Sequence, residues 1–155
     1  MLEISNIQLS YADNMHPIGP KTTAGQLVLP ETVIASVKYS DRSSAEFVYK
    51  LRDQQLKLIS LFMNNEADGI NSIDTSRIKL PAVAKRVVRE INAEVISKLS
   101  PETKEGLAQS YWSEYVYGGA PRQLIMSMKG WSRSNANHHI KKLASAGLIP
   151  ADRGN

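Results

Sequence analysis

The sequence predicts an α+β fold, in which an N-terminal antiparallel sheet and a long helix precede a C-terminal group of short helices. Two observations support this class. Alternating apolar and β-branched residues separated by turn residues occupy the first 62 positions, whereas from residue 80 onward apolar residues recur every three or four positions. Strands followed by helices are typical of α+β proteins, and 155 residues suit one compact domain or two small ones sharing a core.

The N-terminal part predicts three or four strands with one buried face. The alternation in Leu2–Leu9 slips by one position, which indicates a bulge or a strand end. Pro17, Gly19, Pro20 and Gly25 predict a turn-rich stretch over residues 12–25, with Pro30 ending a short strand after it. The remaining predicted elements are a strand at Thr32–Tyr39, a hairpin loop at Ser40–Ser44, a strand at Ala45–Leu51 and a polar turn at Asn64–Gly69. Gln54–Met63 fits a strand or a short helix, and the alternation of Leu56 and Leu58 favours a strand.

Leu80–Leu99 predicts one long amphipathic helix. Pro81 suits its first turn, and its apolar face is formed by Ala84, Val87, Val88, Ile91, Val95 and Leu99. We expect this helix to cover the sheet or to form a dimer contact. Ser100 and Pro101 then predict the cap and first residue of another helix, which ends at Gly118 and Gly119.

Two further short helices are predicted on either side of Gly130. Pro121 begins the first, and Gly130 suits the left-handed conformation that a tight turn between helices needs. Ser132 is a good N-cap for the second, whose apolar stripe is Ala136, Ile140, Leu143 and Ala144 and which ends near Gly147. We expect Trp131 to pack into the core beside the turn.

This arrangement predicts a helix-turn-helix that reads the major groove of DNA with helix 133–146. Residues 121–155 contain six basic residues and one acidic residue, a net charge of +5, whereas residues 1–120 carry −1. Arg and Asn can bond guanine and adenine in a bidentate manner, and Ser and Lys suit phosphates. The predicted DNA-binding residues are Arg122, Ser132, Arg133, Ser134, Asn135, Asn137, His138, Lys141, Lys142 and Arg153.

The C-terminal pattern resembles a group of small actinobacterial and actinophage proteins with a C-terminal helix-turn-helix. The matching positions are Tyr111, Pro121, Ile125, Gly130, Trp131, Ser132, Ser134, Ala136, Ile140 and the closing Gly147, Leu148, Ile149 and Pro150. Residues 70–87 are also similar to the link between the β-rich part and the helices in that group. Met126 and His139 depart from the pattern, which usually has a small residue and a Trp or Arg there. The resemblance implies DNA binding and assigns no target.

Other chemistries find little support in the sequence. The chain has no cysteine, which excludes disulfides, thiolate nucleophiles and Cys-based zinc sites. His138 and His139 are adjacent on a helix and point about 100° apart, so metal chelation is not expected. Residues 64–74 lack the closing Glu of a calcium loop, and no catalytic or nucleotide-binding motif is present. No signal peptide or membrane span is predicted, so we expect a cytoplasmic protein that is not an enzyme and has no cofactor.

We therefore expect a β-rich N-terminal domain at 1–79, a connecting and packing helix at 80–99, and a helix-turn-helix DNA-binding domain at 100–155. The expected function is sequence-specific binding of double-stranded DNA by a transcriptional regulator. A homodimer, formed by the N-terminal part, would read two half-sites. No small-molecule ligand is predicted. Two alternatives remain open: an accessory protein in DNA packaging, partition or recombination, and an adaptor that binds protein instead of DNA.

Overall fold

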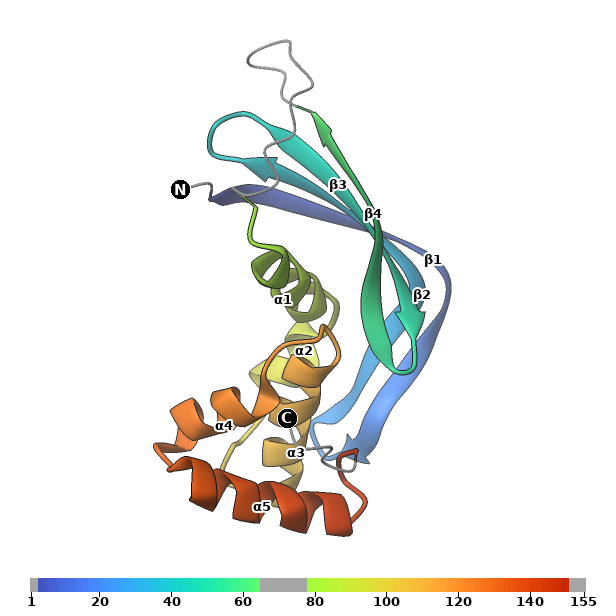
Figure 1. The fold of residues 1–155 in the computed structure, drawn as a ribbon. Coiled ribbons are helices and arrows are strands. Elements are labelled where there is room, and N and C mark those ends of the chain that lie inside the picture. The colour runs from blue at the N-terminus through green and yellow to red at the C-terminus, as the bar shows by residue number, and fades with distance from the viewer. Residues whose placement is uncertain (1–2, 65–77, 151–155) are drawn as a thin grey trace.

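A computed structural model describes residues 3–64 and 78–150 and shows an antiparallel sheet followed by helices (Figure 1). This confirms the α+β class. The sheet has four strands in chain order, and the helices lie on its concave side. The strands are β1 (Ile4–Thr22), β2 (Gly25–Tyr39), β3 (Ser44–Arg52) and β4 (Gln55–Asn64). The helices are α1 (Leu80–Ile91), α2 (Ala93–Ser97), α3 (Lys104–Tyr115), α4 (Pro121–Lys129) and α5 (Arg133–Ser145).

The β1–β2 hairpin corrects the predicted turn-rich stretch at residues 12–25. β1 continues through Pro17 to Thr22, and β2 passes through Pro30 without a break. Proline is tolerated in a strand where its missing N–H would not pair. Pro17 lies opposite Val28, and Val28 directs its own N–H and C=O to the side chain of Asn92 instead of to β1. Pro17 therefore lies in an irregular edge strand, and Pro30 lies in the neighbouring strand β2, instead of in a loop.

The other strand predictions agree with the structure. The register shift between Ile4 and Asn6 is the predicted slip in the first strand. The β3–β4 hairpin closes through Asp53 and Gln54, whose φ angles of 51° and 62° fit a tight two-residue turn. The predicted turn after Asn64 lies outside the described residues.

The predicted helix Leu80–Leu99 is two helices, because the chain bends at Asn92. The side chain of Asn92 is buried. Its amide oxygen accepts a hydrogen bond from Val28 N (2.8 Å), and its amide nitrogen donates to Val28 O (3.1 Å). These bonds give the backbone N–H and C=O of Val28 a partner at a point where β3 does not pair with β2. The β2–β3 ladder begins only at Thr32. The helix is thus interrupted at Asn92, the residue whose side chain joins it to the sheet.

Helix α3 begins later than Ser100 and Pro101 predict. Its N-cap is Thr103, whose hydroxyl accepts a hydrogen bond from Gly106 N at 3.0 Å. Farther along, the buried amide of Gln109 donates to Thr22 Oγ1 (2.7 Å) and to Gly25 O (2.6 Å). These bonds hold the tip of the β1–β2 hairpin against α3.

One continuous hydrophobic core joins the sheet to all the longer helices. Leu27, Val33 and Phe47 from the sheet pack with Val87 and Val88 of α1. The same cluster extends through α3 to the C-terminal helices, where its members are Leu107, Ala108, Tyr111, Trp112, Val116, Ile125, Ala136, Ile140, Leu143 and Ile149. The position of α5 is therefore set by packing on the rest of the molecule.

Candidate nucleic-acid interface

Helices α4 and α5 are separated by a turn that depends on Gly130. Pro121 occupies the first turn of α4, and Gly130 ends this helix with φ 67° and ψ 26°. That left-handed conformation disfavours a residue with a Cβ. The N–H groups of Gly130 and Trp131 both point to the carbonyl of Met126 and close the last turn. The chain therefore reverses within three residues before α5 begins at Arg133.

The N-terminus of α5 is capped as the sequence predicts. Ser132 is extended (φ −67°, ψ 162°), and its hydroxyl accepts a hydrogen bond from Asn135 N at 3.2 Å. The buried stripe of α5 consists of Ala136, Ile140 and Leu143, each at most 3% exposed. One side of the helix therefore packs in the core, and the other side is exposed to solvent.

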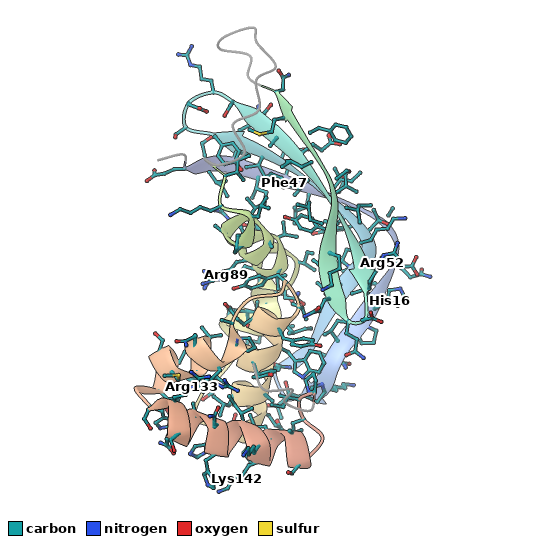
Figure 2. The ribbon with its side chains drawn as sticks, viewed as in Figure 1. His16, Phe47, Arg52, Arg89, Arg133 and Lys142 are labelled. Atoms are coloured by element: carbon teal, nitrogen blue, oxygen red, sulfur yellow. The ribbon has the colours of Figure 1, made fainter. Side chains whose placement is uncertain are left out.

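Seven of the ten predicted DNA-binding residues are brought together on the exposed part of α5 and its cap. They are Ser132, Arg133, Ser134, Asn135, His138, Lys141 and Lys142. In Figure 2, Arg133 lies on the side of α5 that faces α4, and Lys142 lies on the opposite side of the helix. The segment 132–145 contains three basic residues and no acidic residue. We refer to these seven residues, which lie around the solvent-exposed sides of the helix and its cap, as the α5 face; they are cationic or carry hydrogen-bonding groups.

The other three predicted residues do not join the α5 face. Arg122 lies on α4 and is only 9% exposed, so it belongs to the interior of the helical part. Asn137 is half-buried, because it follows Ala136 at the border of the apolar stripe, and its Oδ1 is buried without a hydrogen bond. Arg153 lies outside the described residues. The periodicity of apolar residues in the sequence did not indicate that Arg122 is buried and Asn137 half-buried.

An aromatic stack beside the N-terminus of α5 was not anticipated. Trp131 is half-buried and stacks on His139, with ring centroids 4.0 Å apart and an interplanar angle of 13°. Lys129 Nζ lies 5.3 Å from the centroid of the Trp131 ring. An apolar residue before an N-cap predicts a contact one turn into the helix. Trp131 is instead partly buried at the edge of the core and stacks on His139, two turns into α5.

His139 is kept neutral by its surroundings. Desolvation, followed by the positive potential of His138, Lys142 and Lys129, lowers its pKa from the usual 6.5. A neutral imidazole can stack on the indole without adding another positive charge. The formal positive charges of the α5 face come from Arg133, Lys141 and Lys142.

Two further contacts anchor this helical pair. Trp112 Nε1 of α3 donates to Leu148 O at 2.8 Å, just after α5, and Lys129 Nζ donates to Pro101 O at 3.2 Å. Lys129 also lies 3.9 Å from Glu102. Lys129 therefore makes contacts within the protein, whereas Arg133, Lys141 and Lys142 of the α5 face are exposed to solvent.

The comparisons give no relative for this chain: no protein-family model, no curated protein and no solved structure matches it. Within residues 3–64 and 78–150, no three His, Asp or Glu side chains are grouped as metal ligands would be. None of the helices in these residues is long and apolar enough to cross a bilayer. The functional assignment therefore depends on the geometry of the α5 face.

Proposed function

We propose that this protein binds double-stranded DNA in a sequence-specific manner through the α5 face and acts as a transcriptional regulator. The observation that carries the proposal is a capped helix with one side packed in the core, whose exposed residues include cations, an amide and hydroxyls but no carboxylate. An α-helix fits the major groove of B-DNA, and the first turns of such a helix contact base edges.

Position along α5 suggests the role of each side chain. Arg133 lies in the first turn, where bidentate contacts to guanine are made in helices of this kind. Lys141 and Lys142 lie two turns later and suit the phosphate backbone. Ser132 already accepts a hydrogen bond as the N-cap, so we expect it to position the helix and to donate only through its hydroxyl hydrogen.

The burial of Trp131 and His139 against each other supports a rigid approach to DNA. The turn and the first two turns of α5 are fixed by Gly130, the Ser132 cap and this stack. A helix that is ordered before binding loses less conformational entropy on association. The α5 face therefore has the fixed geometry that base readout requires.

The test selects bound duplexes from a random pool and then measures fluorescence anisotropy with the selected duplex at two salt concentrations. We expect Arg133→Ala to cost about 1–3 kcal/mol and to relax specificity at one position. Lys141→Ala should weaken all duplexes alike and reduce the salt slope by about one. Lys50→Ala, an exposed cation on β3, is the matched control and should change neither quantity.

Three results would contradict the proposal. The first is no affinity for any duplex at low salt, which would favour an adaptor that binds protein. The second is binding without enrichment of any sequence, which would favour an accessory role in packaging or partition. The third is a loss of DNA affinity in Lys50→Ala that equals the losses in Arg133→Ala and Lys141→Ala.

A further inference from the structure

The two edges of the sheet differ in how well they are protected against pairing with another strand. Unpaired edge strands are usually blocked by prolines, bulges or charges. β1 has such features: Pro17 and Pro20 lie within it, and its register shifts three times. β4 has a single register shift opposite Val48 and Tyr49, and its ladder is regular from Ser60 to Asn64. Among the described strands, only β3 pairs with β4.

Among the described residues, β4 also has more exposed large apolar side chains than β1, the other edge strand. Phe62 is 62% exposed, Ile59 48% and Leu58 37%. Leu58 lies opposite the buried Tyr49, and Phe62 lies opposite the exposed Glu46, so the apolar side chains flank the edge on both faces of the sheet. Large apolar groups around an open edge are typical of a strand that pairs with another chain.

We propose that the outer edge of β4 pairs antiparallel with β4 of a second copy of this chain, forming a twofold dimer with an eight-stranded sheet. The charge pattern fits this occupant. Lys57 is the only charged residue from Gln55 to Asn64, and it lies near one end of the strand. Antiparallel pairing places the two copies of Lys57 at opposite ends, so no like charges face each other.

Side-chain alternation limits the register of this pairing. In the regular part of β4, Ser60, Phe62 and Asn64 share one face of the sheet, and Leu61 and Met63 share the other. Opposite residues in an antiparallel pair must point to the same face, so the twofold axis passes beside Leu61 or Phe62 and not between them. Both registers cover the two Phe62 rings.

The arrangement leaves the α5 face uncovered. Figure 1 shows the C-terminal end of β4 at the end of the molecule opposite α5. The dimer surface itself does not depend on DNA binding; only its use, to present two α5 helices to two half-sites, depends on the proposed function. A twofold dimer is also the commonest symmetric assembly of soluble chains.

Sedimentation equilibrium without DNA tests the pairing. We expect the wild-type chain to dimerise, and Phe62→Lys to weaken the dimer by about tenfold or more, because it places like charges across the axis. Met15→Lys is the matched control: it substitutes an apolar side chain 41% exposed on the opposite edge strand and should leave the dimer intact. Circular dichroism melting verifies that each variant folds.

A crosslinking measurement covers the case in which Phe62→Lys does not fold. The chain has no cysteine, so Phe62→Cys provides a single thiol at the proposed axis. A short bis-maleimide should link two Phe62→Cys chains and should not link two Met15→Cys chains. A wild-type chain that stays monomeric up to about 100 μM, a dimer that Phe62→Lys leaves intact, or preferential linking of Met15→Cys would overturn the proposal. Because no DNA is present, failure here is distinct from failure of the DNA proposal.

Discussion

Replacing Asn92 by Ala should weaken the attachment of the helices to the sheet. Asn92 is 2% exposed, and its side chain makes three hydrogen bonds to backbone atoms: with Val28 N (2.8 Å), Val28 O (3.1 Å) and Val88 O (3.3 Å). The two bonds to Val28 replace the pairing that β3 does not provide there. Alanine would leave both groups of Val28 without a partner.

The expected loss follows from those unpaired groups. A buried backbone group left without a partner costs about 1–3 kcal/mol, and Val28 is half-buried, so the lower part of this range applies to each group. We therefore expect the free energy of unfolding to fall by about 2–3 kcal/mol. For a chain of this size that corresponds to a decrease in Tm of about 5–10 °C.

Urea unfolding followed by circular dichroism measures this change. Ser97→Ala is the control, because its hydroxyl donates only to the exposed carbonyl of Glu94 at 2.9 Å; we expect a change within about 0.5 kcal/mol. Equal stabilities of Asn92→Ala and wild type would refute the inference that this amide joins the helices to the sheet. A large loss in Ser97→Ala would show that the bend itself, and not the amide, is sensitive.

Three further changes test the helical part. Gly106→Ala should destabilise the fold by about 3 kcal/mol or more, measured by thermal melting, because its Cβ would lie 1.7 Å from Ser100 O, a backbone atom; unchanged stability would contradict this packing. Trp112→Phe removes the donor to Leu148 O and should cost about 1–2 kcal/mol in urea unfolding; retention of full stability would show that this bond is dispensable. Folding lowers the pKa of His139, so the unfolded chain binds more protons and the free energy of unfolding should fall as pH drops through about 6.5. His139→Phe should flatten that part of the pH profile in urea melts, and an unchanged slope would assign the effect to another group.

The C-terminal helices were well predicted, because their boundaries are set by local chemistry. Gly130, Ser132 and Gly147 each act within a few residues of their own position, through a left-handed conformation or a cap. The buried stripe of α5 follows from its 3.6-residue period. The prediction that Arg122 is exposed was wrong, because its burial does not depend on local chemistry. It depends on how α4 packs, which the periodicity of a nine-residue helix does not determine.

By itself, the sequence determined the order of strands and helices, the two capped helices around Gly130 and the concentration of positive charge in the last 35 residues, because each depends on neighbouring residues or on composition alone. The tertiary structure decided the rest. In the tertiary structure, β1 continues through two prolines, and the long helix is interrupted at Asn92. Among the described strands, β4 pairs on one side only and has exposed apolar side chains. Those features depend on which backbone groups find a partner far away in the chain, and local propensity does not contain that information.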